Sequence, residues 1–200
     1  MTVQDLLERT LTRLPGPALC SIFDAVGGVQ DIIVNRMLLR RSDMLSKDPP
    51  AEITYAVGDD KSVLPADYVL LSGRPYLPGQ TPLSPLAGRD TAGLQIAGPP
   101  RFFSVTGHNL CIYPPTDKAI VLMVPYFFKP PAPSSLADAL PFNGEFDSVI
   151  IDGCVAVMSH GMAALSERGF VSIIQAQVDG RLDAREMLAE QLIADSINGI

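Results

Sequence analysis

The feature that most constrains the fold of this chain is where proline and glycine fall along its 200 residues. From Ala51 to Pro133 they recur every few residues with short apolar runs between them, whereas both flanking segments carry apolar residues at helical spacing. Proline cannot donate to a β-ladder and it breaks helices, so the middle of the chain can hold only short strands joined by turns. The sequence therefore predicts helices at both ends and a β-rich insertion between them.

The predicted fold class is α+β, a mainly α-helical bundle with an inserted β-hairpin or small antiparallel sheet and a proline-rich extended loop. Residues 1–48 are expected to form N-terminal helices, residues 51–133 the β-rich insertion, and residues 141–200 the C-terminal helices. At roughly 150 residues per domain, this length indicates a single domain, residues 1–200.

Within the insertion, residues 101–106 and 109–113 flank Gly107-His108, a pattern that predicts a β-hairpin with a tight turn. Residues 119–128 are predicted as the strongest strand. Residues 73–100 contain turn residues throughout, and we expect them to form a surface excursion with little regular structure.

Several helix boundaries can also be predicted. Thr2 and Asp5 resemble a capping box at the start of the first helix. Gly27-Gly28 lies in the middle of the second helix, where we expect a kink, a break or a close helix crossing. Asn143 is the expected N-cap of the third helix, and Gly169 and Gly180 are expected to interrupt the helical sequence after it.

Composition indicates contacts with other chains. Apolar residues make up 47% of the chain and charged residues only 18%, below the roughly 25% that is usual for soluble domains. The surplus predicts surfaces that are covered by partners. The net charge of -7 argues against a broad nucleic-acid-binding face. No apolar run approaches the ~20 residues of a membrane helix, no secretory leader is visible, and three widely spaced cysteines are read as reduced thiols.

The search for chemistry yields only weak candidates. Ser159 and His160, with Asp152 upstream, suggest a nucleophile, but adjacent helical residues point about 100° apart and do not share a proton. Glu145 and Asp147 suit the first turn of a helix better than a pair of catalytic carboxylates. We therefore expect no enzymatic activity, no cofactor and no metal site.

Candidate interface residues come from two regions. Aromatic residues are enriched at interface centres, although a sheet's own core can also use them. A proline-rich loop loses little entropy on docking. The C-terminal segment is unusually apolar for a chain end, which predicts that it docks on a partner. The candidates are Tyr68, Tyr76, Phe127, Phe128, Leu192, Ile193 and Ile197.

The order of short motifs in the second three-quarters of the chain resembles the head–tail adaptor (connector) proteins of tailed bacteriophages. The motifs are Leu64-Pro65-Ala66-Asp67-Tyr68, Gly73-Arg74-Pro75, Pro99-Pro100-Arg101-Phe102-Phe103, Asn109-Leu110-Cys111-Ile112-Tyr113-Pro114 and Tyr126-Phe127-Phe128-Lys129-Pro130-Pro131, followed by two closing helices. Each motif is short, so the resemblance rests on their order and spacing. The closing helix departs from the family pattern, because it is rich in Gly and Ala.

The resemblance implies a structural virion protein without catalytic activity. Such adaptors form a ring of about twelve subunits beneath the portal, extend the DNA channel and join the capsid to the tail. The implied partners are other copies of the chain, the portal, and a tail or nozzle protein. Packaged DNA would pass through the lumen without sequence-specific binding, and no membrane is involved. The implied location is the neck or tail of the virion, with assembly in the host cytoplasm.

Two alternatives remain at this point. One is another neck or tail-tube component, such as a stopper or terminator. The other is a small virion-associated peptidoglycan hydrolase.

Overall fold

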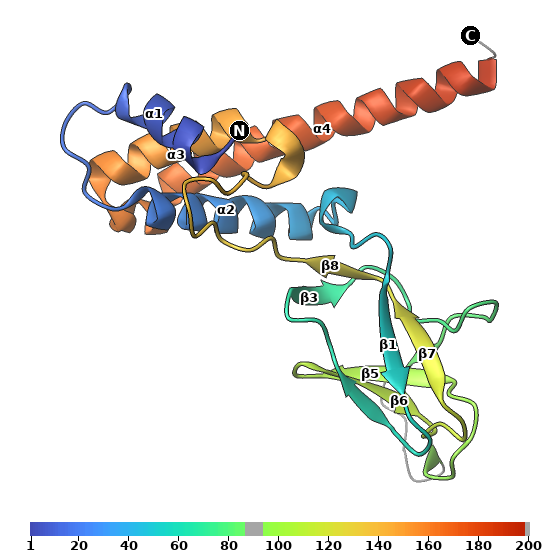
Figure 1. The fold of residues 1–200 in the computed structure, drawn as a ribbon. Helices are drawn as coiled ribbons and strands as arrows, with labels where there is room; N and C mark the ends of the chain where they lie inside the picture. Colours follow the sequence, from blue (N-terminus) through green and yellow to red (C-terminus); the bar gives the residue numbers. More distant parts are fainter. Residues whose placement is uncertain (87–93, 199–200) are drawn as a thin grey trace. The chain divides into compact units, whose positions relative to one another are not determined.

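A computed structural model describes residues 1–86 and 94–198 (Figure 1). The chain forms two compact units. The helical unit comprises Met1–Met44 and Pro130–Ile200, and the β unit comprises Leu45–Lys129. The α+β class is confirmed, and the β-rich segment is inserted between helices as expected.

In the helical unit, α1 (Val3–Leu11), α2 (Ile22–Leu39) and α3 (Asp147–His160) pack with the first half of α4 (Arg168–Asn198), as Figure 1 shows. Short 3-10 turns occur at η1 (Asp43–Leu45), η3 (Phe142–Gly144) and η4 (Met162–Ser166). The core consists of fully or nearly fully buried side chains from α2, α3 and α4, among them Val26, Val29, Ile33, Met37, Ile150, Cys154, Val157, Ile174, Val178 and Leu182.

The predicted capping box is confirmed. The Thr2 hydroxyl accepts a hydrogen bond from the Asp5 amide at 3.3 Å, and the Asp5 carboxylate accepts one from the Thr2 amide at 2.9 Å. At Gly27-Gly28, α2 continues without a break. A Cβ at Gly28 would collide with the Leu165 side chain, whereas Gly27 faces open space. The expectation of a break is therefore wrong, and at Gly28 α2 packs closely against a side chain of η4.

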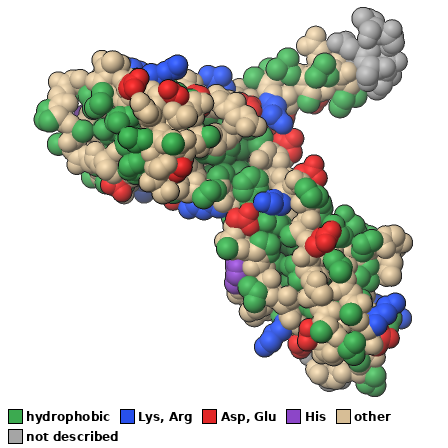
Figure 2. Space-filling view, in the orientation of Figure 1, with side chains coloured by type: hydrophobic (Ala, Val, Ile, Leu, Met, Phe, Trp, Pro, Cys, Tyr) green, Lys and Arg blue, Asp and Glu red, His purple; other side chains and the backbone are tan. Residues whose placement is uncertain are grey.

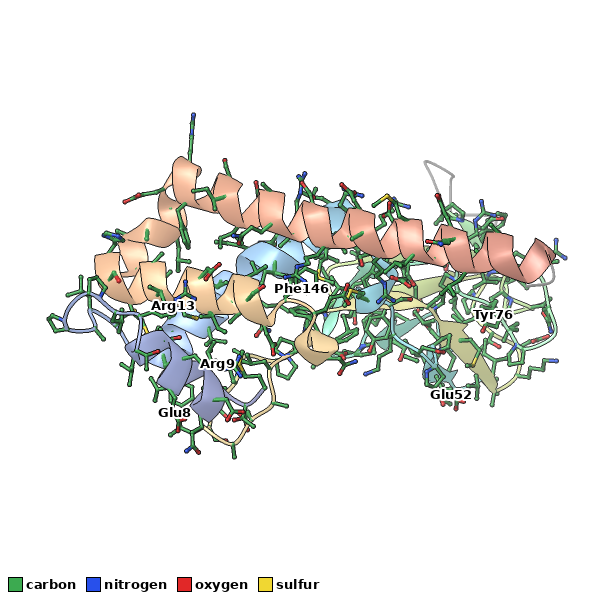
Figure 3. All side chains as sticks on the ribbon, turned by 90° about the horizontal axis from the view of Figure 1, so that it is seen from above. Glu8, Arg9, Arg13, Glu52, Tyr76 and Phe146 are labelled. Atoms are coloured by element: carbon green, nitrogen blue, oxygen red, sulfur yellow. The ribbon has the colours of Figure 1, made fainter. Side chains whose placement is uncertain are left out.

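Three predictions about where helices begin or are interrupted are wrong. Asn143 lies inside η3 with φ +49°, and α3 begins four residues later, at Asp147. The reason is Phe146, labelled in Figure 3, which occupies the N-cap position of α3. Its ring is fully buried and lies edge-on to that of Phe142 at 5.4 Å between ring centroids, so its burial sets the start of the helix. Gly169 and Gly180 do not interrupt α4, which is continuous from Arg168 to Asn198.

The described residues of the β unit form three small sheets. In the first, β1 (Ala51–Tyr55) pairs antiparallel with β7 (Ile120–Val124), and in the second β3 (Tyr68–Leu71) pairs with β8 (Tyr126–Phe128). The third has the order β2–β6–β5–β4, formed by β2 (Lys61–Val63), β6 (Asn109–Tyr113), β5 (Phe102–Thr106) and β4 (Ser84–Pro85).

The predicted hairpin is confirmed as β5–β6, with Thr106 opposite Asn109 across a turn in which Gly107 has φ +60°. The predicted strand 119–128 is two strands, because Pro125 lacks the N–H that a continuous ladder would need. The predicted excursion 73–100 contains the short strand β4, and its residue Tyr76 forms a β-bridge with Met123. Its residues 87–93 lie outside the described part of the chain.

The core of the β unit lies between these sheets. Tyr55 is fully buried and its hydroxyl donates to the Leu110 carbonyl at 2.8 Å. Apolar side chains from the strands and from the segments that connect them surround it, including Ile53, Leu64, Phe103, Ile112, Ile120, Leu122 and Val124. Each unit thus has its own hydrophobic core.

Candidate partner-binding surfaces

Several exposed large apolar residues of the helical unit follow one another along α4. Side chains of α4 are buried at intervals as far as Leu182, and every residue from 183 to 194 is exposed. We call residues 183–194 the α4 arm. Figure 1 shows that the arm extends beyond the other helices of the unit, and Figure 2 shows hydrophobic side chains along it. The large apolar residues there are Met187, Leu188, Leu192 and Ile193.

Two of the predicted interface residues lie on this arm. Leu192 is 70% exposed and Ile193 60% exposed. Leu188, which sequence reasoning did not select, is 62% exposed and lies four residues before Leu192, on the same side of the helix. The third C-terminal candidate, Ile197, lies within α4, but its side chain is outside the described part of the structure.

Ion pairs fix α4 against α2 where the arm begins. Arg36 donates to both carboxylate oxygens of Asp179, at 2.8 and 2.6 Å, and Arg40 donates to Asp183 at 2.7 Å. The two arginines are four residues apart in α2, and the two aspartates are four residues apart in α4. The two ion pairs therefore lie one helical turn apart along the contact between the helices. Because these pairs flank Gly180, they explain why that glycine does not interrupt the helix.

Hydrogen bonding from Arg36 lowers the pKa of Asp179 below its usual 3.8. A lowered pKa in the folded state stabilises the protein above the unfolded value, and this contribution is lost as the pH falls toward and through the folded value.

We expect Asp179→Asn to lower the urea midpoint of unfolding at pH 6. We also expect the urea midpoint of the variant to fall less than that of the wild type as the pH is lowered below about 4. Urea titrations followed by circular dichroism would measure both effects. Asp117→Asn, at an exposed residue of the β unit, is the matched control for the loss of one carboxylate and should keep the wild-type urea midpoint at pH 6. An unchanged acid profile in Asp179→Asn would contradict this role of the ion pair.

The aromatic candidates differ in their exposure. Phe127 is only 5% exposed, so its ring belongs to the packed interior of the β unit. Tyr68 is half-buried and contacts the Tyr126 ring at 5.8 Å between centroids. Phe128 is half-buried, with the Lys47 ammonium 5.4 Å from its ring centroid. Tyr76, labelled in Figure 3, is half-buried on the strand-like segment that pairs with Met123. These rings lie on different elements of the β unit.

The residues considered for catalysis are not arranged as a catalytic group. The Ser159 hydroxyl donates to the Val155 carbonyl at 2.6 Å, and Asp152 pairs with Arg13 at 2.8 Å. Burial raises the pKa of the Cys154 thiol to about 12, so this cysteine is a core residue and not a reactive thiolate. In the described part of the chain, no three His, Cys, Asp or Glu side chains are grouped to hold a metal ion. Among the described helices, none has the length and hydropathy required to cross a membrane.

The SU10 adaptor protein family model matches residues 1–196, nearly the whole chain. The chain therefore belongs to the SU10 adaptor protein family, which is a family of bacteriophage head–tail adaptors. A comparison with curated proteins finds no match. Membership confirms the resemblance that the motif order indicated. It makes the chain a structural bacteriophage protein of tail assembly, and it implies a place in the virion neck and contacts with portal and tail proteins.

Proposed function

We propose that the chain is a head-to-tail adaptor that forms a ring beneath the portal, extends the DNA channel and joins the capsid to the tail. The observation that carries this proposal is the α4 arm in a member of an adaptor family. An exposed apolar helix that leaves its own bundle costs solubility unless a partner covers it. Packing against a neighbouring protein is the simplest way to bury it.

The α4 arm is assigned to the portal. Leu188 and Leu192 offer two large aliphatic side chains on one side of the helix, the pattern of a helix that docks in an apolar groove. Arg36 and Arg40 hold α4 firmly where the arm begins, so the arm loses little conformational freedom on binding. The Ile197 region would extend the same contact toward the end of the chain.

The ring is proposed to contain about twelve copies, joined by two different complementary surfaces on each subunit. The half-buried rings of Tyr68, Tyr76 and Phe128 are candidates for contacts of the β unit with neighbouring copies or with the tail or nozzle protein. Residues 1–200 would act as one adaptor domain in which each unit serves a different contact.

The net charge of -7 per chain gives such a ring a strongly acidic character. If acids line the lumen, repulsion between like charges lets packaged DNA slide without sequence-specific binding. The ring would occupy the virion neck after assembly in the host cytoplasm. The proposal includes no bond-breaking step and no cofactor or metal.

Immobilised cognate portal should retain the purified full-length chain. The portal of an unrelated phage, immobilised in the same way as the control, should not retain it. Incubation of the same preparation with cell-wall glycan should release no soluble sugar. Failure of the cognate portal to retain the chain would contradict the proposed function, and release of sugar would favour the hydrolase alternative.

A further inference from the structure

The end of α2 has a residue in a backbone conformation that glycine usually occupies. The amide of Ser42 donates to the Met37 carbonyl at 3.0 Å, and the amide of Arg41 donates to the Leu38 carbonyl at 3.1 Å. These two bonds form a Schellman motif, whose left-handed position commonly holds glycine because a Cβ is disfavoured there. In this chain that position is Arg41, with φ +51°. The backbone therefore carries a conformational cost that a glycine would remove.

The side chain at this position lines a notch between the end of α2 and α4. The notch has a volume of about 240 Å³ and contains apolar residues of α4 together with charged residues of both segments. Its lining consists of Arg40, Arg41, Ser42, Asp43, Leu182, Arg185, Glu186 and Ala189. Because three of these residues belong to the α4 arm, a protein that docks along the arm reaches the notch.

Two of the three arginines in the notch form ion pairs with carboxylates of this chain. Arg40 pairs with Asp183 at 2.7 Å and with Glu186 at 3.4 Å. Arg185 pairs with Asp43 and with Glu145, both at 3.4 Å. Among the described residues, no carboxylate pairs with the third guanidinium, that of Arg41, which is exposed. Arg41, whose backbone is strained, is thus the one arginine of the notch whose guanidinium is available to a partner.

We propose that Arg41 binds a carboxylate of the portal, donated by an acidic side chain that enters the notch when the portal docks on the α4 arm. A guanidinium fork matches a carboxylate with two parallel hydrogen bonds, and Leu182 and Ala189 add apolar surface to the lining of the notch. The inference rests on the proposed function and specifies one contact within it. It explains why arginine occupies a position where glycine would make the protein more stable.

Arg41→Gly tests the proposal because stability and binding should change in opposite directions. Removing the strain should raise the melting temperature of the full-length chain by about 2–4 °C. Removing the guanidinium should weaken binding to the cognate portal about ten-fold in surface plasmon resonance. Arg41→Asn, which tolerates the left-handed conformation without a positive charge, should lose the same affinity. Arg9→Ala, an exposed arginine on α1, is the control for net charge and should bind as the wild type does.

The outcomes separate this inference from the proposed function. If the wild type binds the portal and Arg41→Gly binds equally well, the inference is wrong and the proposed function stands. If the wild type itself does not bind, both fail. A lower melting temperature in Arg41→Gly would overturn the argument from strain. If Arg41→Gly weakens self-association of the chain and leaves portal binding unchanged, the carboxylate belongs to a second copy and the assignment to the portal is wrong.

Discussion

Replacing Leu188 and Leu192 together by aspartate is expected to weaken portal binding by about a hundred-fold or more, while the chain stays folded. Both side chains are largely exposed and touch no core, so their replacement costs the free chain little stability. In the proposed complex they are buried apolar anchors. Truncation of one such anchor commonly costs about 2 kcal/mol or more of binding free energy, roughly a thirty-fold loss of affinity, and the two losses need not be additive. Isothermal titration against the cognate portal, with circular dichroism of the free variant, would measure both properties.

The matched control for this variant lies in the β unit. Val57 and Val63 are each 67% exposed, close to the values for the two leucines. Their double replacement by aspartate adds the same charge and removes similar exposed apolar area, yet it should leave portal affinity within about two-fold of wild type. Equal losses in the two double variants would mean that the charge change, and not the α4 arm, governs binding.

The second large effect concerns stability. Gly153→Ala should lower the free energy of unfolding of the helical unit by about 2 kcal/mol, although alanine is the better helix former. A Cβ at Gly153 would lie 2.7 and 2.8 Å from the two γ-carbons of Val29. Val29 is fully buried and its β-branched side chain has few alternative rotamers, so the backbones of α2 and α3 would have to separate. Urea unfolding followed at 222 nm measures the change.

Two further variants identify the cause. Gly27→Ala, where the new Cβ would point into open space away from every other element, should raise the free energy of unfolding by about 1 kcal/mol. Val29→Ala should rescue part of the Gly153→Ala defect in a double-mutant cycle, because it removes the methyl groups that collide. If the two substitutions prove additive, the predicted contact between α2 and α3 is not the cause of the defect.

The parts of the fold that could be predicted depend on neighbours in sequence. The capping box needs only Thr2 and Asp5, and the β5–β6 hairpin follows from the turn at Gly107. The errors arise where distant residues decide. Asn143 has the chemistry of an N-cap, but the burial of Phe146 places the helix start elsewhere. Gly180 is a residue type that weakens helices, but arginines of α2 bind Asp179 and Asp183, which precede and follow it in α4.

The candidate site shows the same division. The apolar character of the C-terminal segment is visible in the sequence, and it led to Leu192 and Ile193. It did not reveal which residues of α4 remain exposed, since that depends on where the other helices end. Arg41 could not be found from the sequence, because its significance comes from a positive φ and a notch that form only on folding. A spacing of four between the arginines of α2 and between the aspartates of α4 was the one available signal for the ion pairs.

Native mass spectrometry of the cognate portal mixed with an excess of this chain is the most direct test of the central proposal. The portal peak should shift by the mass of about twelve copies of the 21.4 kDa chain, with few partly loaded species, as expected of a closed ring. A portal that keeps its own mass under these conditions, or that binds only one or two copies at saturation, would contradict the account.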